Sequence, residues 1–202
     1  AAFLRGSRLV SGMDMNLLRQ FFADKIDLFL TISHDANIIW SNLESRKEWQ
    51  GQLRLADVVV WRTFESATTR MLAEYLDVKF VELARRADPR AIQGLTKSPA
   101  APSLYLSYPI TSILEEDPAL LDRAAEFAKR LTDIGFVVFD PLSIQDLNSP
   151  QTGEFILLEN DPPLDQAKEA NRYIESQILS RDLQWVDQAD MVVVYYPTEL
   201  VS

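Results

Sequence analysis

Short apolar runs that alternate with helical segments constrain the fold of this chain more than any other feature. The runs are rich in Val, Ile, Phe and Tyr and show little apolar–polar alternation, which is typical of strands buried on both faces. They lie at 26–32, 58–61, 79–83, 104–106, 136–139 and 191–196. Strands that alternate with helices predict an α/β fold built from Rossmann-like parallel sheets flanked by helices.

The helical segments show apolar residues that recur every three or four positions. The clearest one begins at Asp117-Pro118, because Asp is a preferred N-cap and Pro is favoured at the first helical position. Gly135 stands where a glycine commonly ends a helix. Further helices are predicted over 13–23, 64–75 and 163–186.

Two irregular stretches divide the chain. The composition shifts at 87–102, which contains Pro89, Pro99 and Pro102, and 96–103 predicts a linker, so we place one Rossmann-like unit of unknown role in 1–95 and a second α/β domain in 103–202. One continuous sheet is the alternative. The stretch 148–163 is long for a connection and is typical of an exposed insertion or a lid. The chain stops just after an apolar run, so we expect a truncated C-terminal domain.

Composition excludes several classes of chemistry. The 202 residues include no Cys and one His, which excludes disulfides, thiolate catalysis and Cys-ligated zinc, and leaves no second His for a metal site. Lys and Arg number 20 against 30 Asp and Glu, and this net charge of −10 argues against binding to nucleic acid or an anionic membrane. No apolar run approaches the roughly 20 residues of a membrane span. We expect a cytoplasmic protein without metal or cofactor.

Polar side chains follow the predicted strands of the second half at their carboxyl ends, where open α/β sheets bind ligands. Ser107 and Thr111 follow the run 104–106, Asp140 follows 136–139, and Glu199 follows 191–196. Hydroxyls and carboxylates at one sheet edge suit a small polar ligand such as a sugar or a nucleotide.

Two segments of the second half carry a family resemblance. They are LYLSYPI at 104–110 and RDLQWVDQADMVVV at 181–194. Together they resemble the nucleoside 2-deoxyribosyltransferase superfamily, in particular the 2'-deoxynucleoside 5'-phosphate N-hydrolases. The resemblance covers about 103–202, half of the chain, and implies N-glycosidic bond chemistry on a nucleoside or nucleotide.

The resemblance also implies roles for individual residues. Tyr105 would be the pocket tyrosine, and Asp182 would be the sugar-binding or acid/base aspartate, with the sugar lodged between them. In the family a Glu attacks the anomeric carbon; by offset it would fall just beyond Ser202, and Glu199 is the substitute within the chain. The family's glycine-rich turn is missing after the first strand, so hydroxyls such as those of Ser107 and Thr111 would have to bind a phosphate.

Several candidates also have ordinary structural explanations. Asp140 precedes a Pro and is typical of a turn cap. Asp190, which is also a candidate for substrate binding, precedes a strand, where it would hold a backbone amide. His34-Asp35 is either a strand-end cap or part of a site in the first half. Arg62 and Glu65, taken here as following the strand 58–61, either contact a ligand or cap a helix, and Trp185 is expected to pack against the sheet.

Three functions remain open from the sequence. The first is a nucleoside or nucleotide N-glycosidic bond hydrolase or deoxyribosyltransferase. The second is a nucleotide-binding sensor or scaffold without turnover, which the missing Glu and glycines favour. The third is a fragment of a nucleotide kinase, because the first half vaguely resembles the later part of a P-loop kinase, although no GxxxxGK[ST] motif is present. A homo-oligomer is expected, since transferase-type relatives complete their pockets across subunits.

Overall fold

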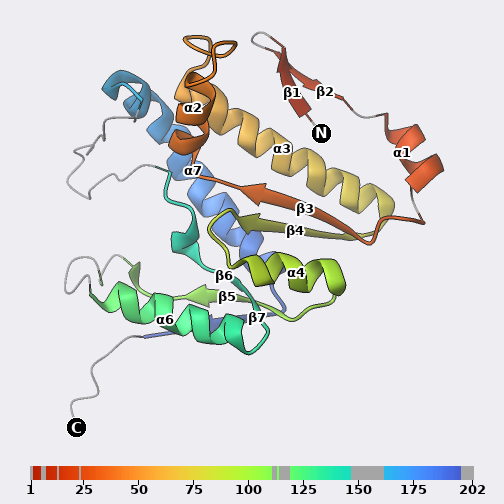
Figure 1. Cartoon of the computed structure of the whole chain (residues 1–202), viewed down its shortest axis with the longest axis vertical. Coiled ribbons are helices and arrows are strands. Elements are labelled where there is room, and N and C mark those ends of the chain that lie inside the picture. Colours follow the sequence, from red (N-terminus) through yellow and green to blue (C-terminus); the bar gives the residue numbers. More distant parts are fainter. Residues whose placement is uncertain are drawn as a thin grey trace. The chain divides into compact units, whose positions relative to one another are not determined.

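The protein has two compact α/β units (Figure 1). The computed structural model describes residues 2–5, 8–12, 14–22, 24–110, 113, 119–146 and 162–196. The first unit combines Ala1–Arg85 with Ile144–Arg181, and the second combines Arg86–Ser143 with Asp182–Ser202. Each holds a small parallel sheet flanked by helices, which confirms the predicted fold class. The segment Ile144–Arg181 returns to the first unit, so neither unit is one continuous stretch.

The first unit contains a hairpin and a parallel strand pair. Strand β1 pairs antiparallel with β2, and β3 pairs parallel with β4 from Leu28 opposite Lys79 to Ser33 opposite Ala84. Two helices make the crossover between β3 and β4, which is the connection that a parallel pair requires. Its elements are β1 (Ala2–Arg5), β2 (Arg8–Ser11), α1 (Met15–Phe22), β3 (Leu28–Ser33), α2 (Ala36–Glu44), α3 (Leu55–Leu76), β4 (Lys79–Ala84) and the first part of α7 (Leu164–Gln188).

The prediction of a strand over 58–61 is wrong, because these residues lie in the 22-residue helix α3. An aspartate in the first turn caps the helix: the carboxylate of Asp57 accepts a hydrogen bond from the backbone N–H of Arg54 (2.9 Å). Buried residues then recur at helical spacing, from Leu55 through Val58 and Val59 to Ser66. Capping and amphipathic spacing outweigh the strand propensity of three consecutive valines.

Helix α3 covers one face of the β3–β4 pair. The buried carboxylate of Glu82 on β4 accepts hydrogen bonds from the hydroxyls of Ser33 on β3 and Ser66 on α3. These bonds satisfy polar atoms that would otherwise be costly to bury. The apolar core around α2 and α3 consists of Ala36, Trp40, Leu53, Leu55, Val58, Val59, Ala170 and Ile174.

The second unit holds a three-stranded parallel sheet in the order β6-β5-β7. Its strands confirm the predicted runs 104–106, 136–139 and 191–196 to within two residues, as β3 and β4 do for 26–32 and 79–83. Its elements are α4 (Pro89–Lys97), β5 (Ser103–Ser107), α6 (Leu120–Asp133), β6 (Val137–Phe139), η1 (Pro141–Ser143), the last turns of α7, and β7 (Met191–Val194).

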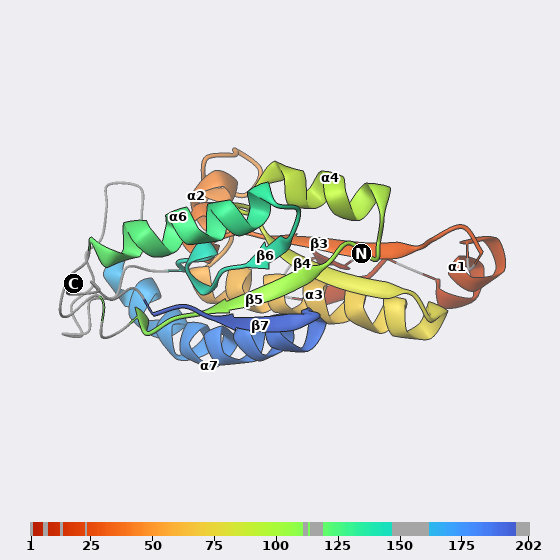
Figure 2. The ribbon, with the colours of Figure 1, turned by 90° about the horizontal axis from the view of Figure 1, so that it is seen from below.

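Helices cover both faces of this sheet, as Figure 2 shows for α6 and α7. Leu104 and Leu106 of β5 point to the α6 side and are fully buried there with Ala124. On the other face the ring of Phe139 stacks on Trp185 of α7, with centroids 6.3 Å apart. Trp185 is fully buried, which confirms that it packs against the sheet.

The stretch 87–102 contains the helix α4, which was not predicted from the sequence and which reaches only the first two residues of the predicted linker 96–103. The side chain of Asp88 accepts a hydrogen bond from the backbone N–H of Arg90 (2.8 Å), and Pro89 occupies the first turn of α4. Gly135, by contrast, ends α6 as predicted, with a φ of 105° that a residue with a Cβ would rarely adopt.

We expect Trp185→Ala to destabilise the protein strongly, because the change leaves a cavity between α7 and the sheet of the second unit. Loss of a buried Trp costs about 3–5 kcal/mol in the free energy of unfolding. Urea denaturation followed by circular dichroism measures it. Leu183→Ala, at a side chain that is 58% exposed on the same helix, is the matched control and should cost well under that. Equal losses for the two variants would contradict this packing.

Candidate functional site

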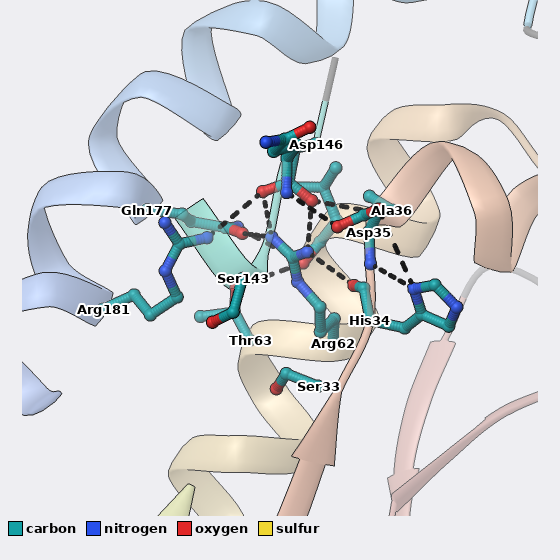
Figure 3. Close-up of polar contacts among 12 residues, drawn as sticks. Ser33, His34, Asp35, Ala36, Arg62, Thr63, Ser143, Asp146, Gln177 and Arg181 are labelled. Atoms are coloured by element: carbon teal, nitrogen blue, oxygen red, sulfur yellow. Dashed lines mark hydrogen bonds and ion pairs between the residues drawn. The ribbon is translucent and has the colours of Figure 1, made fainter. Parts of the chain in front are cut away.

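The carboxyl end of β3 carries a buried ion pair between Arg62 of α3 and Asp146 (Figure 3). Both terminal nitrogens of the guanidinium group donate to the carboxylate: Nη1 to Oδ1, and Nη2 to Oδ2 at 2.9 Å. Nη1 also donates to the backbone carbonyl of His34 (2.9 Å), and Nη2 to Oε1 of Gln177 (3.1 Å). A second cation, Arg181 of α7, lies 3.7 Å from Oδ2 of Asp146.

Two aspartates fix the turn between β3 and α2. The Asp35 carboxylate accepts a hydrogen bond from the backbone N–H of Gln145 (2.7 Å), and the Asp146 carboxylate accepts one from the backbone N–H of Ala36 (2.8 Å). Both side chains are almost fully buried. Asp146 therefore also satisfies a backbone N–H in the first turn of α2, where a negative charge is favourable.

Opposing effects act on the pKa of the Asp146 carboxyl. Burial raises the pKa, but the hydrogen bonds and charge of Arg62, the N–H of Ala36 and the charge of Arg181 outweigh it and lower the pKa below its ordinary value. Asp146 is therefore ionised at neutral pH. The network joins β3, α3, α7 and the segment around Asp146 into one electrostatic unit.

A cavity of about 310 Å³ lies beside this network in the first unit. One wall is the α3 face that carries Val58, Trp61, Arg62 and Glu65, residues three and four apart on a helix. The other walls are the end of β3 and one side of α2. They contribute the lining residues Thr31, Ile32, Ser33, His34, Ile39 and Leu43.

His34 presents a defined edge of its ring. Its Nδ1 accepts a hydrogen bond from the backbone N–H of Asp35 (2.8 Å), so a neutral imidazole carries its proton on Nε2. The side chain is 30% exposed and lines the cavity. The sequence predicts either a cap or a site for His34-Asp35. In the structure the His34 carbonyl accepts a hydrogen bond from Arg62, and the Asp35 carboxylate accepts one from the backbone N–H of Gln145, so both residues help to hold the turn.

Tyr105 and Asp182, the two predicted catalytic residues, lie on the same face of the second unit's sheet. Tyr105 is the register partner of Phe139, so both side chains point to the face that Trp185 covers. Asp182 precedes Trp185 by three residues, which places both on one side of α7. Both Tyr105 and Asp182 are half-buried.

Asp140 lies at the carboxyl end of β6 and caps the short helix η1. Its Oδ1 accepts hydrogen bonds from the backbone N–H of Leu142 (2.9 Å) and from the hydroxyl of Tyr108 (2.7 Å). Burial, together with the neighbouring Asp140 charge and its hydrogen bond, raises the pKa of Tyr108 well above its ordinary value. Ser107 ends β5 at the same edge of the sheet. Asp140 therefore caps η1 as predicted. A role in ligand binding would have to use its Oδ2.

Asp190 lies at the opposite end of the strands, just before β7. Its Oδ2 accepts hydrogen bonds from the backbone N–H (2.7 Å) and the hydroxyl (2.8 Å) of Ser103, the first residue of β5. Ser103 and Ser107 are four strand residues apart, roughly 13 Å. Asp190 thus ties two strands together at the amino edge and is not brought near Ser107 or Asp140.

Thr111 and Glu199 lie outside the described residues, as does most of the stretch 148–163 that was expected to be an insertion or a lid. Where the structure describes the chain, no cluster of three His, Cys, Asp or Glu side chains is placed to hold a metal ion. Within the same residues, no helix is long and apolar enough to cross a membrane.

The sequence did not indicate the buried ion pair or the cavity. Arg62 and Glu65 stood out only as residues after a supposed strand, whereas both lie within α3. Asp146 carries no local signal, because its partner Arg62 is 84 positions away. The signal that could have placed Arg62 and Glu65 in a helix is Asp57, which indicates that a helix begins just before it. Arg62 and Glu65 are three residues apart and would then lie on one face of that helix.

Comparison with models of known protein families, with curated proteins and with solved structures found no match for this chain. Its function is therefore inferred from its own residues and their geometry.

We expect Asp146→Asn to destabilise the first unit, because Arg62 and Arg181 would face each other without the carboxylate. Breaking a buried pair costs about 3–5 kcal/mol in the free energy of unfolding at neutral pH. Since folding lowers the pKa of Asp146, its contribution is complete above the unfolded pKa of about 3.9 and is lost as the pH falls through the lower folded value.

Denaturation curves of wild type and Asp146→Asn from neutral to acidic pH measure this effect. The difference between the two proteins should shrink below about pH 4. Asp165→Asn, at a side chain that is 76% exposed, is the matched control and should stay within about 0.5 kcal/mol of wild type. A wild-type stability for Asp146→Asn at pH 7 would contradict the assignment.

Proposed function

We propose that the second unit cleaves or transfers the N-glycosidic bond of a nucleoside or nucleotide. The observation that carries the proposal is that Tyr105 points to the face of the β6-β5-β7 sheet that Trp185 covers, and that Asp182 lies on the same side of α7 as Trp185. The resemblance of 104–110 and 181–194 to the deoxyribosyltransferase superfamily supports the same chemistry.

The reaction breaks the bond between the anomeric carbon and the base nitrogen, through a transition state with positive charge on the sugar. A carboxylate facing that carbon stabilises the charge, and the departing base takes up a proton. In hydrolysis the oxygen of a water molecule forms the new bond to the anomeric carbon, and in transfer a nitrogen of a second base forms it. Asp182 would either bind sugar hydroxyls or exchange the proton, and Tyr105 would position the sugar.

The remaining predicted residues would hold the substrate. Ser107 ends β5 at the carboxyl edge of the sheet and offers a hydroxyl group there. Asp140 would contribute its Oδ2, since Oδ1 serves Tyr108 and Leu142. Thr111 and the candidate nucleophile Glu199 lie outside the described residues, and their roles stay part of the proposal.

Nucleotide binding without turnover is the second candidate. It is favoured by the departure of the chain from the family pattern after β5, where the glycine-rich turn is missing. Under this alternative, nucleotides raise the melting temperature of the full chain but release no base.

A homo-oligomer and a cytoplasmic location complete the proposal. Strand β7 pairs with β5 on one side, and Met191, Val192 and Val194 are 45%, 49% and 75% exposed. An exposed apolar strand at the edge of a sheet favours association with another chain. The absence of Cys fits a reducing compartment.

We expect the full chain to release free base from at least one deoxynucleoside or deoxynucleoside monophosphate, and Asp182→Asn to reduce kcat/KM by about 100-fold or more. Chromatography of the reaction mixtures detects the base. Tyr105→Phe removes only the phenol oxygen and should lower activity less than Asp182→Asn does.

Asp190→Asn is the matched control, because it changes a carboxylate of the same unit that ties β5 to β7. It should lower the free energy of unfolding by about 1–3 kcal/mol, which is the cost of losing a hydrogen bond to a charged group. It should leave kcat/KM of the folded protein within about twofold of wild type. No base release from folded wild-type protein, or full activity in Asp182→Asn, would exclude the proposal.

A further inference from the structure

We infer that the cavity in the first unit binds a small uncharged aromatic heterocycle with hydrogen-bonding groups, of the size of a nucleobase or nucleoside. The cavity lies at the carboxyl end of β3, beside a parallel strand pair and its crossover helices. Open α/β sheets bind ligands at this position. The inference concerns a different unit from the proposed glycosidic chemistry and does not depend on it.

The size of the cavity limits the ligand. Its volume of about 310 Å³ is at the low end of the range for ligand pockets, about 300–1,000 Å³. A single ring system with or without a sugar fits this scale, and a dinucleotide exceeds it. Such pockets combine apolar walls with a few directed polar groups, which is the composition found here.

The apolar walls suit a flat ring. Ile39 and Leu43 come from one side of α2, and Val58 and Trp61 come from the facing side of α3. Ile32 at the end of β3 adds apolar atoms to the lining, and a ligand in the cavity would cover apolar surface of these walls. Burial of such surface favours binding.

The charges of the cavity disfavour an anion. Arg62 is the cation in the lining, and its guanidinium is held by Asp146, the His34 carbonyl and Gln177, as Figure 3 shows. Glu65 adds a carboxylate one turn further along α3. A phosphate in this place would meet an arginine that Asp146 already neutralises, so an uncharged ligand is preferred over its phosphorylated form.

Three kinds of polar group give the ligand its orientation. Nε2–H of His34 donates, because Nδ1 already accepts from the backbone of Asp35. The carboxylate of Glu65 accepts and suits a ring amino or imino group. The hydroxyl group of Thr31, at the edge of the cavity, can do either.

Isothermal titration calorimetry with common nucleosides, their free bases and their 5'-monophosphates tests this inference. The full chain carrying Asp182→Asn is used, so that the proposed activity of the second unit consumes no ligand. At least one nucleoside or base should bind, and its monophosphate should bind about tenfold more weakly or worse, since Asp146 already neutralises Arg62, the cation of the cavity.

Two variants assign the binding to the cavity. Glu65→Gln should weaken binding about tenfold or more, as expected for a lost hydrogen bond to a charged group, and Leu43→Trp should abolish it by filling the space. Glu74→Gln, at an exposed carboxylate of the same helix that pairs with Arg70, is the matched control and should bind like the parent. Circular dichroism checks that each variant is folded.

The outcomes separate this inference from the proposed function. Binding that is lost in Glu65→Gln and Leu43→Trp supports the cavity site, whether or not the wild-type protein releases base. No binding by any member of the panel, unchanged affinity in both folded variants, or tighter binding of the monophosphates would overturn it.

Discussion

The buried pair of Arg62 and Asp146 is the interaction on which the first unit depends. It joins α3 to a segment that returns to this unit from 84 positions further along the chain, and the same carboxylate caps α2. Gln177 and Arg181 bring α7 into the network. A buried pair of this kind gives little net stability compared with apolar packing, but losing one partner is costly, so it makes the arrangement specific.

The pair also determines what the neighbouring cavity can bind. Because Asp146 neutralises Arg62, the carboxyl end of β3 presents apolar walls, an imidazole edge and a carboxylate rather than an open cation. The second unit differs, since its candidate residues Tyr105 and Asp182 lie on a sheet face that Trp185 partly covers. The two units therefore offer different chemistry on similar βα scaffolds, a binding pocket in one and a proposed glycosidic site in the other.

Much of the fold could be predicted from the sequence because its parallel strands are continuous apolar runs, including β7, whose residues Met191, Val192 and Val194 are exposed. The run 58–61 looks the same but forms part of α3, since the Asp57 cap and the spacing of buried residues favour a helix. Helix α4 was not predicted, although Asp88-Pro89 at its start is the same Asp-Pro signal that predicts a helix at Asp117-Pro118, a position outside the described residues.

The candidate sites were less predictable, because they depend on contacts between distant residues. The segments 104–110 and 181–194, which carry the family resemblance, point to Tyr105 and Asp182. Only the strand register and the helix spacing of the structure place the two residues on one face of the β6-β5-β7 sheet. Asp190 belongs to the second of these segments, yet its bonds to Ser103 place it at the far edge of the strands. Nothing local distinguishes an aspartate that binds a neighbouring strand from one that binds a substrate.

The structure of the full chain with a nucleoside analogue whose glycosidic bond cannot be cleaved tests the central claim most directly. The account predicts the sugar between the Tyr105 hydroxyl and the Asp182 carboxylate, with at least one hydrogen bond of about 3 Å to each. A sugar bound elsewhere, with both side chains closed off from it by α7, would contradict glycosidic chemistry in the second unit.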